Sequence, residues 1–312
     1  MKKFQFDTTP LIPCSRFSLP LDWNKEFKRD SPLDVEIGFG MGEFLLRSAL
    51  QNPGRDYIGI ESDWERVYKT LKRISREGKG EIKNIRILKL DAKIVFRYVF
   101  SGRIIDNIYC LFPCPWPKKA HVKHRLFSRD FLNLVNNRLK DTGRLRIVTD
   151  SKMFALWVVE EARNTGFDRT EEEIDAVYDT KYERKWKAQG QEKFFELDFV
   201  KNKHKIIKTA KEHVLESYKL KDFNPDKFEF KDLTGKITVI LKDFIFDKIR
   251  NKGLLYFIVS EKELTQHFRI FIDRRNEKWY FSKADGQTIF PTEGLKLALK
   301  MAYEAALATV KE

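Results

Sequence analysis

Short apolar runs alternate with amphipathic stretches along the first half of the chain. The run from Leu33 to Ile37 has the length of a buried strand, and apolar side chains then recur at helical spacing until Asn52-Pro53-Gly54. Later runs predict strands at 56–60, 84–90, 105–112 and 144–148, and helices at 63–76, 94–100, 127–140 and 153–164. Strands that alternate with helices at this spacing indicate an α/β fold with a doubly wound, mainly parallel sheet and right-handed crossovers.

The pattern changes near residue 200. A basic run follows, which we interpret as a connector or an exposed helix face: Lys201, Lys203, His204, Lys205, Lys208 and Lys211. Beyond it, alternating apolar and polar positions predict antiparallel strands at 227–231, 237–246, 254–260, 269–274 and 279–282, hairpin loops at 247–253 and 274–277, and a closing helix at 292–309. A chain of 312 residues has the length of two domains. We therefore predict one domain over residues 1–200 and a second, smaller α+β domain over residues 201–312.

The chain carries 60 Lys and Arg residues against 46 Asp and Glu residues, which gives a formal net charge of +14. Excess cationic side chains gain counterion-release free energy on a polyphosphate, so a nucleic acid is the first partner to consider. Richness in Lys and Glu also marks the surfaces of heat-adapted proteins, so charge alone does not decide between the two interpretations.

Several classes of protein are disfavoured. The longest apolar stretches, such as Leu254 to Ser260, are far shorter than the roughly 20 residues of a membrane-spanning helix. The segment from Met1 to Pro13 lacks the apolar core of a secretory signal, and three cysteines provide no disulfide framework. We expect a cytoplasmic protein, a monomer or a homodimer, with no membrane partner. The pattern assigns no role to Cys14.

Three glycines and two acids gather at the ends of the first three predicted strands. In a doubly wound sheet, ligands bind beyond the carboxyl ends of the strands. Gly38, Gly40 and Gly42 allow a tight turn and the close approach of a ligand to the backbone at a helix N-terminus. Glu61 is placed to bind two ribose hydroxyls, and Asp91 is placed to bind an adenine amino group. The pattern favours an adenosine-type cofactor, although such glycines are often only geometry and such acids often only helix caps.

The spacing of the glycines separates two cofactors of this type. The NAD fingerprint G-x-G-x-x-G requires a third glycine where Glu43 stands. Glu36, two residues before the first glycine, would repel a pyrophosphate but attract a cofactor that carries an ammonium and a sulfonium group. We therefore predict S-adenosylmethionine rather than NAD.

The segment after the fourth strand combines rigidity, an aromatic ring and basic side chains. Prolines at 113, 115 and 117 exclude a helix, so we expect a stiff loop beside the cofactor. Trp116 is followed by basic residues that include Lys118, His121 and Arg125. A phosphate-bearing aromatic base requires such a ring for stacking and such cations for its backbone. The alternative is a packed Trp116 beside a solvated basic turn.

Two other chemistries remain open for this loop. Cys110, Cys114, His121 and His124 would be the ligands of a zinc site, but the spacing is shorter than in zinc fingers and Cys110 falls in a buried strand, so we predict no metal. Alternatively, Cys114 would act as a covalent nucleophile on a pyrimidine ring, activated by Lys118 and His121. That mechanism is typical of pyrimidine C5 methyltransferases.

Taken together, the motifs resemble those of the bacterial tRNA (guanine-N7-)-methyltransferases over about residues 33 to 200. The motifs are E-I-G-F-G-M-G at 36–42, Y-I-G-I-E at 57–61, Asp91-Ala92, the loop F-P-C-P-W-P-K-K at 112–119, Thr149-Asp150 and T-K-Y-E at 180–183. The resemblance implies a Rossmann-like class I methyltransferase fold, S-adenosylmethionine as the methyl donor, and methylation of a guanosine in the variable loop of tRNA.

Carried over position by position, the resemblance implies that Glu36, Glu61 and Asp91 hold the cofactor, and that Lys118, Asp150 and the segment from Thr180 to Glu183 meet the guanosine. With the candidates from the pattern, the predicted cofactor site comprises Glu36, Gly38, Gly40, Gly42, Glu61, Asp91, Ala92 and Cys114. The predicted guanosine site comprises Trp116, Lys118, His121, Arg125, Asp150, Thr180 and Glu183.

Three positions depart from the family pattern. The family usually has Asp, regarded as its catalytic residue, where Cys114 stands, and Arg where Ala120 and His124 stand. Guanine N7 carries no proton, so the transfer needs no general base at the attacking atom and depends mainly on positioning. A carboxylate near the ring would stabilise the positive charge that the ring gains. We therefore hypothesise that Asp150 or Glu183 supplies this charge, with Cys114 a passive residue or a thiolate.

The departures leave open the interpretation that the protein is not an enzyme, because loss of the family carboxylate would be compatible with a noncatalytic tRNA-binding protein.

The C-terminal part lies outside the common core of the family. Its aromatic residues alternate with basic ones, which predicts either a sheet that contacts RNA or simply the core of that sheet. They are Tyr256, Phe257, Phe271, Trp279 and Tyr280, with Arg269, Arg274, Arg275 and Lys278.

Overall fold

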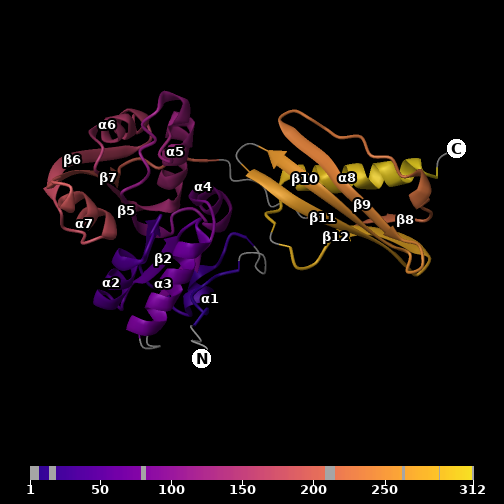
Figure 1. Ribbon diagram of the computed structural model, residues 1–312, viewed down its shortest axis with the longest axis horizontal. Coiled ribbons are helices and arrows are strands. Elements are labelled where there is room, and N and C mark those ends of the chain that lie inside the picture. Colours follow the sequence, from indigo (N-terminus) through magenta and orange to yellow (C-terminus); the bar gives the residue numbers. More distant parts are fainter. Residues whose placement is uncertain are drawn as a thin grey trace. The chain divides into compact units, whose positions relative to one another are not determined.

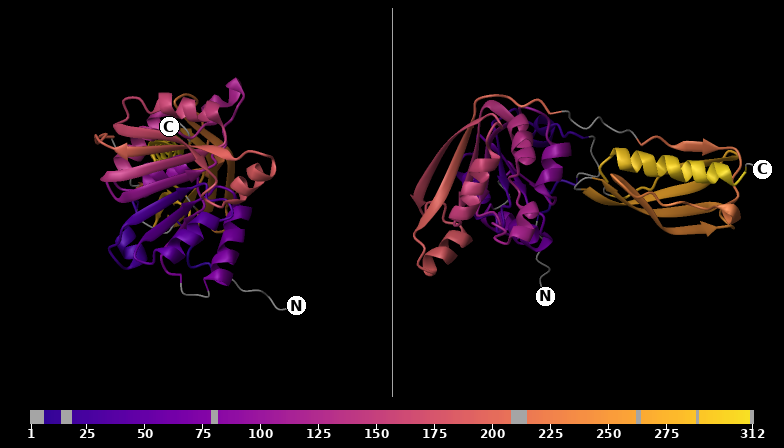
Figure 2. Two further views of the ribbon diagram at one scale, coloured as in Figure 1. Left: turned by 90° about the vertical axis from the view of Figure 1, so that its left-hand side faces the viewer. Right: turned by 90° about the horizontal axis from the view of Figure 1, so that it is seen from above.

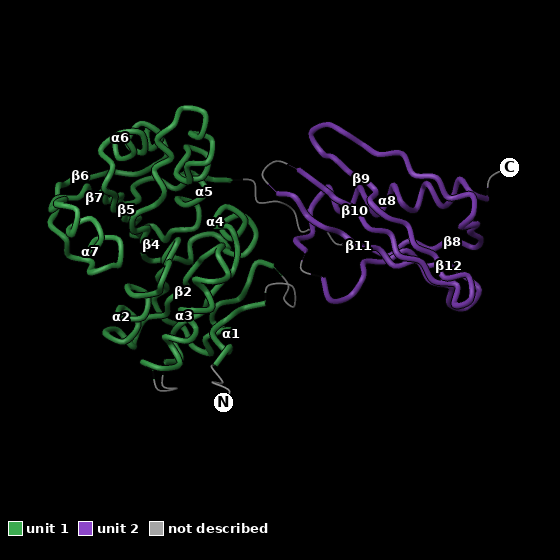
Figure 3. The backbone as a smooth tube through the Cα atoms, in the orientation of Figure 1, with its two compact units in different colours: residues 1–209 green, residues 210–312 purple. Residues whose placement is uncertain are grey.

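A computed structural model describes residues 7–13, 19–78, 82–207, 215–261, 264–287 and 289–310. The chain divides into two compact units, Met1–Thr209 and Ala210–Glu312 (Figure 3). Cys14, Lys208 and Lys211 lie outside the described residues. Among the described residues, no helix is both long enough and apolar enough to cross a lipid bilayer.

The first unit is built on a seven-stranded sheet with the order β3-β2-β1-β4-β5-β7-β6 (Figure 1). The strands are β1 (Leu33–Ile37), β2 (Asp56–Ile60), β3 (Ile85–Leu88), β4 (Ile105–Leu111), β5 (Leu139–Thr149), β6 (Phe167–Asp175) and β7 (Lys193–Lys201). Strands β1 to β5 are parallel to one another. At one edge, β7 pairs antiparallel with β5 and β6 pairs antiparallel with β7; both are coloured reddish in Figure 2 (left). The predicted doubly wound, mainly parallel sheet is confirmed.

Helices connect these strands. They are α1 (Trp23–Phe27), α2 (Glu43–Gln51), α3 (Trp64–Glu77), α4 (Ala92–Ile94), a π-helical turn at Val95–Val99, a 3₁₀ helix at Lys119–His124, α5 (Arg129–Arg138), α6 (Lys152–Glu161) and α7 (Lys181–Ala188). The apolar stripes of α2 and α3 pack against β2 and β3 in one buried cluster. The order of the strands therefore places the first turn, between β1 and α2, in the middle of the sheet.

The structure extends the prediction at the far edge of the sheet. β5 begins at Leu139, where we expected a helix, because Leu139 pairs with Ile105 before the register shifts and pairing resumes at Arg144. β6, α7 and β7 were not predicted, since β6 is an exposed edge strand rich in Glu without apolar alternation. Lys201, expected in an exposed basic run, is instead buried at the end of β7, where its Nζ donates to the Leu139 carbonyl at 2.6 Å.

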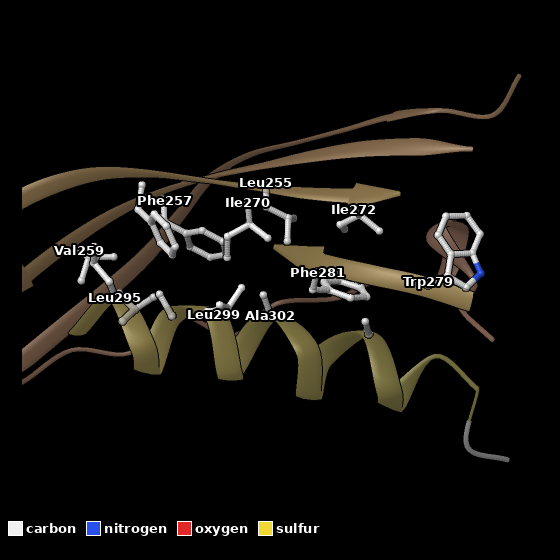
Figure 4. Close-up of a cluster of buried hydrophobic side chains, with 14 of the residues drawn as sticks. Leu255, Phe257, Val259, Ile270, Ile272, Trp279, Phe281, Leu295, Leu299 and Ala302 are labelled. Carbon is white, nitrogen blue, oxygen red and sulfur yellow. The ribbon is translucent and has the colours of Figure 1, made fainter. Parts of the chain in front are cut away.

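The second unit is a five-stranded antiparallel sheet with the order β8-β12-β11-β10-β9, covered on one face by α8 (Glu293–Ala308). Its strands are β8 (Tyr218–Leu220), β9 (Ile237–Asp247), β10 (Lys252–Glu261), β11 (Leu264–Arg275) and β12 (Lys278–Lys283). Apolar side chains of the sheet meet Leu295, Leu299 and Ala302 of the helix (Figure 4). The predicted strand at 227–231 is wrong: Phe228 and Phe230 alternate because they pack on this core from an irregular segment, not because they belong to the sheet.

A buried arginine in the first unit links the end of α5 to the π-helical turn at Val95–Val99. Arg138 is 1% exposed at the end of α5. It donates to the carbonyls of Phe96 at 2.7 Å and Arg97 at 3.2 Å, and to Asn137 Oδ1 at 2.7 Å. These carbonyls end the π-helical turn, where the backbone has no donor of its own. Burial lowers the pKa of Arg138 to about 10.

Arg138→Met should destabilise the first unit by about 3 kcal/mol, because a side chain of similar volume leaves the buried carbonyls without donors. The measurement is the free energy of unfolding in urea. Arg163→Met is the control: its ion pair with Glu160 is exposed, so its loss should change the same free energy by less than about 0.5 kcal/mol. Equal effects of the two substitutions would contradict the assignment.

Candidate active site

The turn after β1 shows which glycines leave room for a ligand. Gly38, Gly40 and Gly42 all have positive φ, at 70°, 55° and 68°. A Cβ at Gly42 would lie 2.3 Å from Thr70 Cγ2, so this glycine allows α2 to pack against α3. A Cβ at Gly38 would meet nothing within 4 Å, and one at Gly40 only the Gly38 carbonyl at 3.9 Å. The backbone of Gly38 and Gly40 therefore faces open space, where a ligand can approach it closely.

Glu36 lines a cavity in front of this turn with a carboxylate that is 5% exposed. Its Oε2 has no hydrogen-bond partner within the described part of the chain. Burial is the main reason why the pKa of Glu36 is raised to about 8; the Glu61 and Glu43 carboxylates also raise it, against the lowering effects of the Leu45 backbone N–H and of Arg47. A buried carboxylate without a partner is costly when ionised, so this site favours a bound cation.

Glu61 lies behind the same turn with its carboxylate already oriented. Oε2 accepts from the Gly40 N–H at 3.1 Å, and Oε1 accepts from the N–H groups of Ser62 at 2.9 Å and Asp63 at 3.0 Å. Arg66 Nη1 lies 3.5 Å from Oε2. Four contacts fix this carboxylate at the end of β2.

The third acid of the predicted cofactor site differs from the first two in its exposure. Asp91 is exposed, caps α4 by accepting from the Lys93 N–H at 2.8 Å, and precedes the buried Ala92. Neither Asp91 nor Glu61 lines the cavity that contains Glu36, whose lining residues are Glu36, Gly38, Phe39, Gly40, Met41, Glu43, Phe44, Arg66, Leu111, Thr180, Lys181 and Tyr182.

The segment before α7 forms one wall of that cavity. Thr180 caps the helix by accepting from the Glu183 N–H at 3.2 Å. The Glu183 carboxylate, 1% exposed, accepts from the N–H groups of Val177, Tyr178 and Thr180 at 3.0 to 3.1 Å. Glu183 therefore shapes the wall, and its oxygens are already used by the backbone.

Glu43 joins this wall to the glycine turn. Its carboxylate accepts from the Lys181 N–H at 2.7 Å and from Arg184 at 2.7 Å, and Arg73 of α3 lies 3.4 Å away. A second link runs from Arg66 to the Tyr182 hydroxyl at 3.4 Å. Sequence reasoning used Glu43 only to argue against NAD. The signal that could have revealed its linking role was an acid at the first position of a helix, together with basic residues on two later helices.

The loop between β4 and the 3₁₀ helix packs Trp116 against two imidazoles, which also contact each other. Trp116 has φ of 43°, and its ring centroid lies 5.6 Å from that of His121 and 5.2 Å from that of His124. Arg125 does not share the exposed position of Lys118. It is 4% exposed and donates to the carbonyls of Pro115 at 3.0 Å and Trp116 at 3.2 Å. Arg125 therefore stabilises the conformation of the loop through its backbone carbonyls.

The cysteines near this loop differ in exposure. Cys110 is 2% exposed within β4, and burial raises the pKa of its thiol, whereas Cys114 is exposed in the loop. In the described ranges of the chain, no three His, Cys, Asp or Glu residues are grouped so that they would hold a metal ion.

Asp150 follows β5 and is half-buried. Its backbone carbonyl accepts from Gln191 Nε2 at 3.1 Å. Its carboxylate forms no hydrogen bond or ion pair with any residue for which the structure gives a position. Of the two acids considered for the guanosine side, Asp150 is thus the one whose carboxylate is available to a ligand.

Comparison with known proteins gives the chain its family. A family model described as "Putative methyltransferase" matches residues 30–196. The tRNA (guanine-N(7)-)-methyltransferase of Thermotoga maritima is 31% identical over 300 residues, which cover 93% of this chain and 94% of the relative. The Aquifex aeolicus protein of that name is 30% identical over 86% of this chain and 92% of its own length. The Chlorobium phaeobacteroides protein is 40% identical over 55% of this chain and 83% of its own length. The chain therefore belongs to the tRNA (guanine-N(7)-)-methyltransferase family.

Proposed function

We propose that this protein transfers a methyl group from S-adenosylmethionine to N7 of a guanosine in the variable loop of tRNA, in the cytoplasm, as a monomer or homodimer. One observation carries the proposal in a chain of this family: Glu36 Oε2 is buried without a hydrogen-bond partner among the described residues, beside the open backbone of Gly38 and Gly40. A cationic cofactor fits this place, whereas a pyrophosphate does not.

The donor side of the site follows from these contacts. S-adenosylmethionine, when bound, supplies a methyl group on a positively charged sulfur. Glu36 holds the cationic part, Gly38 and Gly40 allow the backbone to contact it, and Glu61 presents an oriented carboxylate to the ribose hydroxyls. Asp91 has an exposed carboxylate at the cap of α4, where it is accessible to the adenine amino group, with Ala92 beside it. Gly42 acts through packing, since it keeps α2 against α3.

The guanosine side requires orientation and negative charge rather than a base. N7 has a lone pair and no proton, so the residues have to hold the ring in line with the methyl group. Trp116 offers a ring for stacking, and Lys118 and His121 offer charge to the phosphates. Asp150 stabilises the positive charge that develops on the ring. Glu183, Thr180 and Arg125 are positioning residues, and Cys114 is a passive residue of the loop.

The test is incubation with labelled S-adenosylmethionine and unmodified tRNA, followed by borohydride and aniline cleavage, which breaks the chain at N7-methylguanosine. Cleavage at one variable-loop guanosine supports the proposal. Trapping of the protein on RNA that contains a fluoropyrimidine would support a covalent C5 mechanism through Cys114 instead. Binding of tRNA without any turnover would favour a noncatalytic protein.

Donor binding should strengthen as the pH rises and level off near pH 8. The pKa of Glu36 is raised to about 8, so at pH 7 most of these carboxyls are protonated, and a cation binds only the ionised form. Below pH 8 the Kd for S-adenosylmethionine should increase about tenfold for each unit by which the pH falls. At pH 7, binding should release nearly one proton from Glu36. Calorimetry in buffers of different ionisation enthalpy measures both quantities. Glu36→Gln should bind weakly with neither effect, and pH-independent binding by the unaltered protein would contradict the role of Glu36.

Asp150→Ala should lower kcat at least tenfold, about 1.4 kcal/mol, with the Kd for tRNA unchanged, because the charge is needed only in the transition state. Cys114→Ala should leave kcat unchanged. Glu183→Ala should lower kcat at least tenfold as well, but with a lower Tm, because its carboxylate holds three backbone N–H groups. Single-turnover rates and thermal unfolding separate these cases. A greater loss of rate in Cys114→Ala than in Asp150→Ala would exclude the assignment.

A further inference from the structure

The two faces of the sheet in the second unit differ in what they contact. On one face, alternate side chains of β10, β11 and β12 pack against α8 (Figure 4). The side chains between them point the other way, because successive residues of a strand alternate. From this second set we take the positions in the middle of the sheet as the outer face: Leu254, Tyr256 and Ile258 of β10, His267, Arg269 and Phe271 of β11, and Tyr280 of β12.

The composition of the outer face is unusual. A sheet face opposite a core is ordinarily polar. Toward the strand ends this face does carry polar side chains, such as Ser260, Thr265 and Asp273, whereas its middle, the outer face defined above, is largely apolar or aromatic. Phe271 is 43% exposed. Apolar side chains gathered on one exposed face indicate a surface that binds something.

Cations accompany the rings of the outer face. Arg269 pairs with Tyr256 across the two strands, and its guanidinium carbon lies 5.1 Å from the ring centroid. The His267 ring stacks on the same tyrosine at 5.8 Å and 20°. Around Tyr280, Lys219 Nζ lies 5.6 Å and the Arg275 guanidinium 5.8 Å from the ring centroid.

The charges of these cations differ in availability. Arg275 forms an ion pair with Asp273, which takes up its charge. Among the residues that the structure describes, neither Arg269 nor Lys219 forms an ion pair with a carboxylate. The outer face therefore offers flat rings together with cations whose charge is not neutralised.

Rings and available cations side by side match the chemistry of unpaired nucleotides. Unstacked bases pack on aromatic rings and phosphates pair with Arg and Lys, whereas the bases of a duplex are stacked on one another and present no face to a ring. A second copy of the chain would use the apolar side chains but gain nothing from uncompensated cations. Charge complementarity therefore favours RNA as the occupant.

We propose that the outer face binds unpaired nucleotides of RNA, so that the second unit holds a single-stranded part of the tRNA. That the bound RNA is a tRNA rests on the function proposed above. That the outer face binds unpaired nucleotides is independent of that function. This assignment also divides the aromatic residues singled out in the sequence. Phe257 and Trp279 belong to the core, and Tyr256, Phe271 and Tyr280 belong to the outer face.

The test compares the affinity of full-length variants for RNA by fluorescence anisotropy. The probes are an unmodified tRNA transcript, a single-stranded RNA of about twelve nucleotides, and a duplex of the same sequence. The double variant Tyr256→Thr/Phe271→Thr keeps residues that favour strands and removes both rings. It should bind the single strand and the tRNA at least tenfold more weakly, with little change for the duplex. Arg269→Gln should reduce the slope of log Kd against log salt by about 1.

Two controls accompany these variants. Ile249→Thr removes an exposed apolar side chain outside the outer face, and Lys300→Gln removes an exposed cation on α8. Both should bind all three probes like the unaltered protein. Thermal unfolding of every variant shows that the sheet has formed.

Unchanged affinity of the folded double variant for the single strand would overturn the proposal. So would a double variant that changes from dimer to monomer while its affinity for the single strand stays the same, which would assign the face to a second copy. Donor binding and N7 methylation are measured on the same samples. Absence of methylation by the unaltered protein, with single-strand binding intact, would reject the function proposed above and leave the outer face standing.

Discussion

The structure depends on how its central strand accommodates buried charge. All five residues of β1 are buried, yet two of them are acids. Asp34 is compensated inside the protein, since both oxygens accept from Arg55, at 2.6 and 2.9 Å, and Asn107 donates to it at 2.8 Å. Glu36, two residues further on, is not compensated and has its pKa raised instead. The same strand thus contains one acid whose charge is satisfied inside the fold and one with an oxygen that has no partner among the described residues.

Around that uncompensated acid, most of the site is held by backbone contacts and ion pairs rather than by apolar packing. Glu61 is fixed by three N–H groups, Glu183 by three more, and Glu43 joins α2, α3 and the start of α7. Such contacts orient carboxylates closely without filling the cavity. Glu43 and Glu183 therefore build the site, whereas Glu36 Oε2 and the Asp150 carboxylate have no hydrogen-bond partner among the described residues.

Much of this could be predicted from sequence where the local pattern was strong. β1 and β2 were predicted to the residue, because each is a short apolar run that ends at a turn. The edge strand β6 was missed because nearly all of its residues are exposed on both faces, so its sequence shows no apolar alternation, and only its pairing with β7 makes it a strand. The sequence showed which acidic and glycine residues stand at the strand ends, but it did not show how deeply each is buried or which groups it contacts. Nothing local distinguishes the solvated Asp91 from the enclosed Glu36, or the accessible Lys118 from the buried Arg125.

The wall formed by Thr180, Lys181 and Tyr182 bears on how the enzyme is emptied and refilled. Hydrogen bonds to Glu43 and from Arg66 attach it to the rest of the site, together with the ion pair between Glu43 and Arg184 of α7, which dissolved salt screens. A spent donor that leaves past this wall has to part those contacts, and a fresh donor has to let them re-form. Ionic strength would then act on turnover in two opposing directions, since it hastens the exchange of the small molecule while it loosens the grip on a polyanion.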